Sequence, residues 1–212
     1  MGNQATGSSA SEEAFWRTLL PQDPISLCKR TLAAFDRQKG IYTLRVLDLD
    51  CTIDPRTKDI LAVISADSNP GIVSWDVRLL VLAYMTGAKE ASLVGKWVSP
   101  IGFSGGDLFF SSDAHNLSFA ELLPALKSPE DFLRAGLKIG SSKDTIGDAS
   151  FVLQTLPRIP ILFIYWEGDE EIASKISVLV DESAASHMAI DALWLAIKVS
   201  EKRLLAAVNA KQ

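Results

Sequence analysis

"ASFVLQTLPRIPILFIYWEG", residues 149–168, contains two runs of β-forming residues separated by Pro157 and Arg158. Aliphatic β-branched and aromatic residues are enriched in strands, and a proline between two such runs favours a turn. The stretch therefore predicts a hairpin near residues 149–167. The run at 175–180 predicts a further strand after it.

A second hairpin is expected near residues 41–64. Apolar and polar residues alternate from Ile41 to Ile53, which indicates a strand with one buried face. The polar segment 54–59 favours a turn, and the apolar run 60–65 returns the chain. Short strands are also predicted at 92–100 and 108–110.

Capping residues predict the helices around these hairpins. Asp23 and Pro24 are typical of the N-cap and the first position of a helix, and apolar residues continue at helical spacing as far as Phe35. Ser74 and Gly87 bound a segment that is apolar nearly all round, which indicates a helix covered on most sides. Other helices are expected between Ser11 and Pro21, as two short pieces within 118–141, and over 189–208.

These elements follow one another without a regular strand–helix–strand rhythm. We therefore expect one α+β domain over residues 11–212, with a mostly antiparallel sheet packed with helices and a long C-terminal helix. Residues 1–10 are rich in small and polar residues and are expected to be a disordered leader.

Composition excludes several classes of protein. Of the 212 residues, 48% are hydrophobic and 22% are charged, which is typical of a folded globular chain. The net charge of −5 argues against nucleic acid or an anionic membrane as the main partner. The longest apolar stretch, 77–85, is far shorter than the ~18 residues that a membrane helix needs. Two cysteines are too few for a disulfide framework, which favours reduced thiols in the cytoplasm.

Three segments resemble a known family when they are taken together and in order. They are GIVSWDVRLLVLAYMTGA (71–88), GKWVSP followed by GG-x-L-F (95–109), and IPILFIYWEGDEE with VLVDESAASHM (159–188). The likeness, from about Pro70 to Leu195, is to the bacterial and archaeal family catalogued as domain of unknown function 3786. The resemblance implies a setting in anaerobic metabolism and, because some members are joined to a four-cysteine iron–sulfur module, an iron–sulfur protein as partner. The aromatic and carboxylate residues of the matched segments indicate a small molecule as the other candidate partner.

The resemblance does not supply a reaction or a cofactor, because the activity of that family is not established. This chain also departs from the family pattern, since Ile172 and Ala173 follow the acids where phenylalanine is usual. No iron–sulfur cysteine module is present in the sequence, so an electron-transfer role of longer members does not carry over.

The acid cluster that follows the strand ending near Trp166 is the first candidate site. Asp169, Glu170 and Glu171 lie close together in sequence, and carboxylate oxygens are the ligands that Mg²⁺ and Ca²⁺ prefer. Asp169 and Glu170 are therefore candidate metal ligands, or a pair for general acid–base work. The plainer interpretation is a solvated turn that protects the end of a strand.

Aromatic and ionisable residues elsewhere complete the list of candidate ligand-binding residues. Trp75 and Asp76 begin the predicted central helix, and Lys96 with Trp97 offers a cation beside a flat ring. His187 is a further candidate, with Asp181 and Glu182 near it in sequence. Each also has a structural explanation, as a cap, a core aromatic, an extended lysine or a surface histidine.

Three functions are consistent with this sequence. The favoured one is a small-molecule or cofactor-binding accessory protein, with a pocket that gathers the tryptophans and the 167–171 acids. The second is a hydrolase or lyase that uses Asp169 or Glu170 as a base, with or without Mg²⁺ or Ca²⁺. The third is a scaffold that docks a protein partner on the apolar face of the last helix. A Gly-x-Ser-x-Gly nucleophile motif is absent.

Overall fold

The hairpin predicted at 149–167 forms the centre of an antiparallel sheet. The computed structural model describes residues 10–63 and 71–210. In it, β8 (Ala149–Leu156) pairs with β9 (Ile159–Trp166), and β9 pairs with β10 (Lys175–Asp181). Every residue of β9 except Trp166 is buried, which explains why its sequence is continuously apolar. β7 (Ser142–Asp144) and β6 (Trp97–Val98) complete the order β6-β10-β9-β8-β7.

A second antiparallel sheet is built from the N-terminal third of the chain, in the order β1-β2-β3-β4-β5. Its strands are β1 (Ala34–Asp36), β2 (Ile41–Val46), β3 (Leu49–Asp54), β4 (Asp59–Val63) and β5 (Gly71–Ile72). The single strand expected over 41–53 is wrong: the chain turns at Leu47, which has a φ of 54°, and the alternation restarts in β3.

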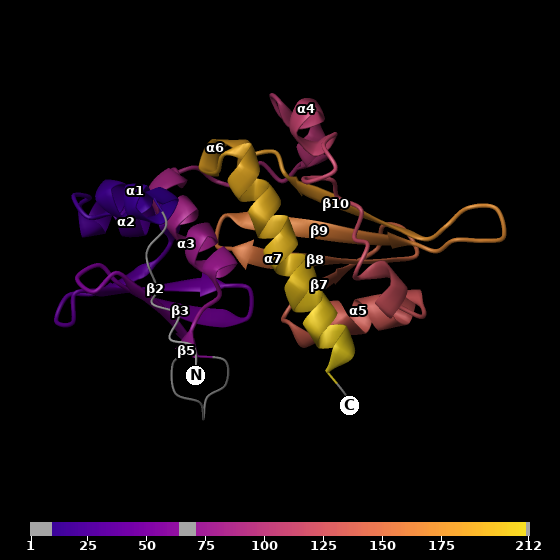
Figure 1. Cartoon of the computed structure of the whole chain (residues 1–212), viewed down its shortest axis with the longest axis horizontal. Helices are drawn as coiled ribbons and strands as arrows, with labels where there is room; N and C mark the ends of the chain where they lie inside the picture. Colours follow the sequence, from indigo (N-terminus) through magenta and orange to yellow (C-terminus); the bar gives the residue numbers. More distant parts are fainter. Residues whose placement is uncertain (1–9, 64–70, 211–212) are drawn as a thin grey trace.

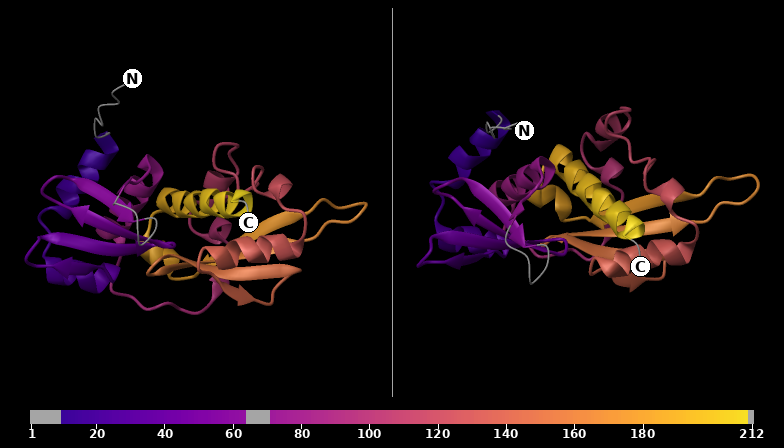
Figure 2. Two further views of the ribbon diagram at one scale, coloured as in Figure 1. Left: turned by 90° about the horizontal axis from the view of Figure 1, so that it is seen from below. Right: turned by 60° about the horizontal axis from the view of Figure 1, so that its bottom comes forward.

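The helices lie against both sheets and between them (Figures 1 and 2). Two 3₁₀ turns, η1 (Pro100–Gly102) and η2 (Leu123–Ala125), accompany them. The α-helices of the described residues are α1 (Ala10–Leu19), α2 (Pro24–Thr31), α3 (Trp75–Gly87), α4 (Gly106–Phe110), α5 (Pro129–Lys138), α6 (Ala184–His187) and α7 (Ile190–Asn209).

The predicted N-cap Asp23 is confirmed, and Ser128 caps α5 in the same way. The Asp23 carboxylate accepts a hydrogen bond from the Ser26 N–H at 2.8 Å, and the Ser128 hydroxyl accepts one from Asp131 N–H at 3.3 Å. Such bonds satisfy backbone donors that a helix leaves free in its first turn. The predicted leader, apart from Ala10 in α1, lies outside the described residues.

Three other predictions need correction. Helix α2 stops at Thr31 because Leu32 adopts a left-handed conformation with φ of 59°, and the next residues enter β1. Residues 108–110 belong to helix α4, which starts after Gly105 turns the chain with a φ of 77°. Within 92–100, only Trp97 and Val98 are in a strand.

One hydrophobic cluster runs through both sheets and joins them by way of α3 and α7. It contains Leu44 of β2, Leu80 of α3, Ile161 of β9 and Ile197 of α7, each no more than 1% exposed. A backbone hydrogen bond of 3.0 Å from Leu47 to Thr155 also connects the sheets directly. The chain thus has the single-domain α+β fold that the sequence predicts, with two antiparallel sheets and a long C-terminal helix.

Helix α7 packs its apolar face inwards. Leu193, Ile197 and Leu204 are at most 1% exposed, so the face on which the scaffold hypothesis depends is covered by the core. No helix within residues 10–63 and 71–210 has the length and apolar character needed to cross a membrane.

The contact of α5 with β8 gives a test of this packing. A Cβ built on Gly136 would lie 2.5 Å from the Phe151 ring, so Gly136→Ala should destabilise the protein by about 1–3 kcal/mol through overpacking. Alanine normally stabilises a helix interior relative to glycine, so the sign of the change is diagnostic. Urea denaturation measures it. In a Phe151→Leu background, where the ring is removed, Gly136→Ala should increase stability. If Gly136→Ala destabilised the Phe151→Leu variant as much as the original chain, the predicted clash with the Phe151 ring would be wrong.

Candidate functional site

The candidate residues do not lie together in the fold. Trp75 and Asp76 begin α3, whereas His187 lies next to the other end of that helix, where a Cβ on Gly87 would meet the His187 carbonyl oxygen at 2.8 Å. Lys96 and Trp97 lie beside Asp181, at the end of β10. The acids occupy the β9–β10 turn at the start of β10, roughly 20 Å away along the strand. The expected pocket gathering the tryptophans and the acids is therefore not formed.

The acid cluster forms the tip of a hairpin that projects from the body of the molecule (Figure 1). Asp169 Oδ1 accepts hydrogen bonds from the backbone N–H groups of Glu171 and Ile172 at 2.8 and 2.9 Å. These bonds hold the pKa of the Asp169 carboxyl below its usual range. Gly168 is required here because a Cβ would lie 2.4 Å from the Ile172 carbonyl oxygen. Asp169 therefore has a structural role in closing the turn.

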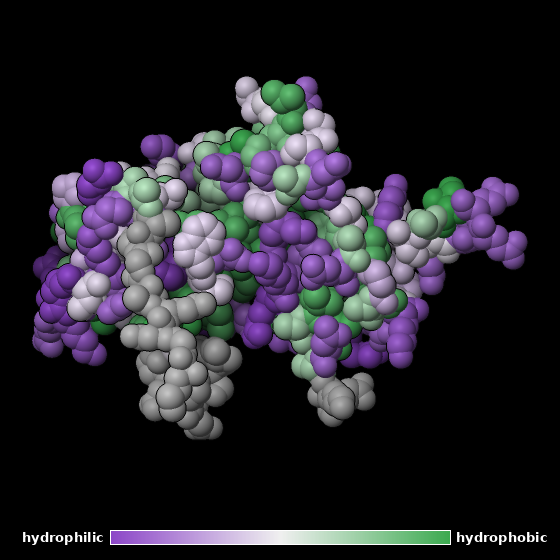
Figure 3. All heavy atoms as spheres, in the orientation of Figure 1, coloured by the Kyte–Doolittle hydropathy of each residue, from purple (hydrophilic) through white to green (hydrophobic). Residues whose placement is uncertain are grey.

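Glu170 and Glu171 are exposed at this hydrophilic tip (Figure 3). Across residues 10–63 and 71–210, no group of three or more histidine, cysteine, aspartate or glutamate side chains is arranged to hold a metal ion. The geometry favours the solvated turn over a metal site or a catalytic pair.

Among the other predicted residues, Asp76 and Lys96 form ion pairs, whereas the two tryptophans keep part of their surface exposed. Asp76 pairs with Lys202 of α7, while Trp75 beside it is 53% exposed. Lys96 Nζ lies 2.8 Å from a Glu182 carboxylate oxygen, and Trp97 is half-buried in β6. These ion pairs link neighbouring elements, α3 to α7 and the segment before β6 to the end of β10.

A buried polar cluster surrounds Asp181 and His187. The Asp181 carboxylate is 3% exposed and accepts bonds from the backbone N–H groups of Val94 and Gly95 at 2.9 and 2.6 Å, and from Ser183 N–H and Oγ–H at 2.9 and 2.6 Å. Burial alone would raise the pKa of Asp181, but these donors lower it below its usual value. The carboxylate fixes the otherwise irregular 92–96 segment against β10.

His187 is 1% exposed, which corrects the surface role considered for it. Its Nδ1 accepts a hydrogen bond from Lys89 N–H at 3.2 Å, which assigns the proton of the neutral ring to Nε2. No partner for Nε2 is found within the described part of the chain. Burial lowers the pKa of His187, the charge of Arg158 lowers it further, and Asp181 acts in the opposite direction.

Arg158 connects this cluster to α2. Its Nε donates to the Arg30 carbonyl at 2.7 Å, its Nη1 to Ala91 O at 2.5 Å, and its Nη2 to Lys29 O at 3.0 Å. The guanidinium thus satisfies carbonyls at the C-terminal end of α2, where a positive charge is favourable.

A hollow of about 530 Å³, which is not among the predicted sites, lies between α2 and β1. Its wall is mainly apolar: Ile25 is 55% exposed, and Cys28 and Phe35 are half-buried. Burial, followed by the charge of Asp23, raises the pKa of the Cys28 thiol, so the neutral form dominates at neutral pH. The residues that line the hollow are Asp23, Pro24, Ile25, Cys28, Lys29, Ala33, Phe35 and Arg37.

The hollow exists because helix α2 ends at Thr31. The helical spacing of apolar residues, which continues to Phe35, did not predict this end. Phe35 continues the helical apolar pattern but belongs to β1, where its ring centroid lies 4.6 Å from that of Tyr42. Because the chain reverses at Leu32, Phe35 faces Ile25 and Cys28 across the hollow instead of following them along a helix.

Replacing the buried carboxylate should produce a graded loss of stability. Asp181→Ala leaves several donors without an acceptor and should cost about 3 kcal/mol, whereas Asp181→Asn keeps one acceptor and should cost about 1–2 kcal/mol. Chemical denaturation measures both. Glu182→Ala, which removes an exposed ion pair next to it, should change stability by less than about 1 kcal/mol. A loss for Asp181→Ala no larger than this control would contradict the role of Asp181.

His187 should make stability depend on pH. Because its pKa is lower in the folded chain, the unfolded chain binds the proton first as pH falls. The contribution of His187 is complete above about pH 6.5, the ordinary histidine value, and is lost as pH decreases through the folded pKa. Urea denaturation between pH 8 and 5 should show a flatter profile for His187→Asn than for the original chain. Parallel profiles would show that the ring does not titrate differently on folding.

Comparison with known proteins identifies the family. A family model described as "Domain of unknown function (DUF3786)" matches residues 23–201. No curated protein and no solved structure matches the chain. Since the matched residues make up most of the sequence, the chain belongs to the DUF3786 family.

Proposed function

We propose that this member of the DUF3786 family is a binding protein that holds a small molecule in the hollow between α2 and β1. The ligand has an apolar body and an anionic group. The observation that carries the proposal is an apolar cavity whose rim bears two cations, Lys29 and Arg37, without ion-pair partners among the described residues.

The size and lining of the hollow support a small ligand. Its volume of about 530 Å³ falls within the roughly 300–1,000 Å³ of typical ligand pockets, which are mostly apolar with a few polar groups. Ile25, Cys28 and Phe35 offer apolar contact from both α2 and β1. A ligand covering Ile25 would remove from water an apolar side chain that is now 55% exposed.

The charges at the rim support an anionic group on that ligand. Asp23 is the one carboxylate in the lining, and it already accepts the Ser26 N–H as the N-cap of α2. Lys29 and Arg37 together outweigh it by one positive charge. In a chain of net charge −5, two cations at one apolar hollow favour a complementary anion.

The chemistry of the lining supports binding over catalysis. The raised pKa of Cys28 makes its thiol a poor nucleophile, and no histidine lines the hollow. The acids on which the hydrolase or lyase hypothesis depends lie on the hairpin tip, where Asp169 closes the turn. An iron–sulfur partner and an anaerobic setting are implied by the family resemblance alone, and ligand binding at this hollow requires neither. The cytoplasm fits two free thiols, Cys28 and Cys51.

Cys28 provides an internal reporter for the test. Cys51 is fully buried, and burial raises its pKa to about 12, so N-ethylmaleimide should modify Cys28 selectively. The probe is 8-anilino-1-naphthalenesulfonate, which combines aromatic rings with one sulfonate. Saturating probe should slow modification of Cys28 by about fivefold or more, since the bound rings cover the thiol. Peptide mass spectrometry over time measures the rate.

Variants separate this hollow from other surfaces. Ile25→Asp should abolish protection of Cys28, because it adds a carboxylate to the apolar wall; Ile172→Asp, at a 66% exposed residue of the hairpin tip, is the matched control. Arg37→Gln should weaken protection, whereas Lys39→Gln, at an exposed lysine outside the hollow, should not. Modification that is equally fast with and without bound probe, or protection unchanged by Ile25→Asp, would refute the proposal.

A further inference from the structure

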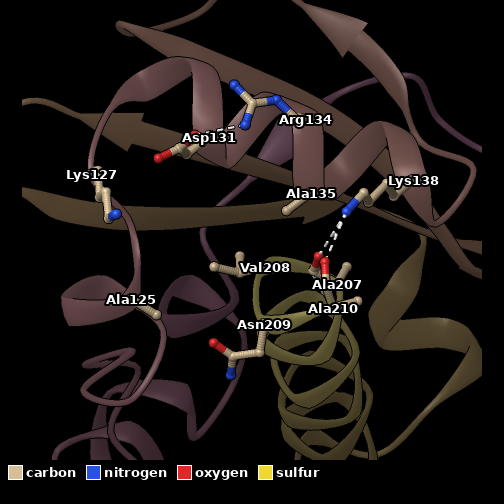
Figure 4. Close-up of a pocket in the computed structure, with 10 residues that line it drawn as sticks. All are labelled: Ala125, Lys127, Asp131, Arg134, Ala135, Lys138, Ala207, Val208, Asn209 and Ala210. Carbon is tan, nitrogen blue, oxygen red and sulfur yellow. Dashed lines mark hydrogen bonds and ion pairs between the residues drawn. The ribbon is translucent and has the colours of Figure 1, made fainter. Parts of the chain in front are cut away.

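A second hollow lies between α5 and the C-terminal end of α7, in the other half of the fold (Figure 4). Its volume is about 440 Å³. Ala125, Ala135 and Ala207 form part of its wall, and these small side chains leave the space open. Like the hollow beside α2, it is bordered by long cationic side chains, and all three of them, Lys127, Arg134 and Lys138, are exposed.

Lys138 neutralises the end of α7 that faces this hollow. Its Nζ lies 3.4 Å from the Ala207 carbonyl oxygen and 3.3 Å from that of Ala210. The last carbonyls of a helix carry a partial negative charge that would repel an anion. With Lys138 in place, the helix end no longer opposes a negatively charged ligand.

The remaining cations are available to such a ligand. Arg134 Nη1 lies 3.0 Å from Asp131 Oδ1, and no second ion pair or hydrogen bond of its guanidinium is found within the described residues. Lys127 has no ion pair in that part of the chain. The lining therefore holds three cations, Lys127, Arg134 and Lys138, against one carboxylate, Asp131, a balance of +2 in a chain of −5.

We propose that this hollow binds a small phosphate-bearing molecule between Lys127 and Arg134. A phosphate group carries about two negative charges and accepts several hydrogen bonds, so it can engage the ammonium and the free N–H groups of the guanidinium together. A long polyanion such as nucleic acid is disfavoured, because the negative charge of the rest of the chain would repel it. The volume of the hollow, about 440 Å³, also suits a small ligand.

Pyrophosphate is the probe for this site. Isothermal titration of the full chain at fixed ionic strength should show binding of pyrophosphate, and Lys127→Ala/Arg134→Gln should weaken it by about fivefold or more. Lys143→Ala removes an exposed lysine of β7 outside this hollow and should leave the affinity within about twofold of the original. Thermal melts establish that each variant is folded, and Lys127→Ala alone serves if the double variant is not.

The pyrophosphate titration tests this hollow separately from the ligand site proposed beside α2. Absence of binding by pyrophosphate at millimolar concentration would overturn the proposal, as would equal affinities for the double variant and the original chain. Citrate binding more tightly than pyrophosphate would overturn the assignment to phosphate. The rate of Cys28 modification should be the same with and without pyrophosphate, because Cys28 lies in the other hollow.

Discussion

The hydrogen bonds of Arg158 are the constraint on which the arrangement of the two halves depends. This side chain extends from the β8–β9 turn to the carbonyls of Lys29, Arg30 and Ala91. A guanidinium with fixed geometry can hold three carbonyls only if α2 and the segment after α3 keep one position relative to the second sheet. Since α2 forms a wall of the apolar hollow, the shape of that hollow depends on a residue of the distant hairpin.

Local signals made much of this fold predictable. The Asp23 and Ser128 caps, the strands β8 to β10 and helix α7 follow from neighbouring residues and from apolar periodicity. Local sequence failed where distant contacts determine the backbone. Leu47 turns with positive φ while its N–H bonds to Thr155, and Asp181 fixes the irregular 92–96 segment. Thr155 and Asp181 are far in sequence from the segments that they position, so local sequence does not reveal these contacts.

The same distinction applies to the candidate site. The chemistry of the acid cluster is local, and its plainer interpretation as a turn agrees with the hydrogen bonds of Asp169. The hollow beside α2 instead depends on a reversal at Leu32, a residue type that rarely adopts left-handed geometry. The spacing of apolar residues, taken alone, predicts that Phe35 belongs to a helix. The break between a capped helix and the polar residues 36–40 was the one available signal.

The tip of the β9–β10 hairpin is held by few side chains. The side chains of Asp169 and Ser174 hold the turn, and Glu171 and Ile172 bond to Asp169 through backbone groups alone. Side chains at 170–172 point into solvent and can be exchanged without disturbing the strands. This projecting segment is therefore a natural position for an epitope tag or a spectroscopic label.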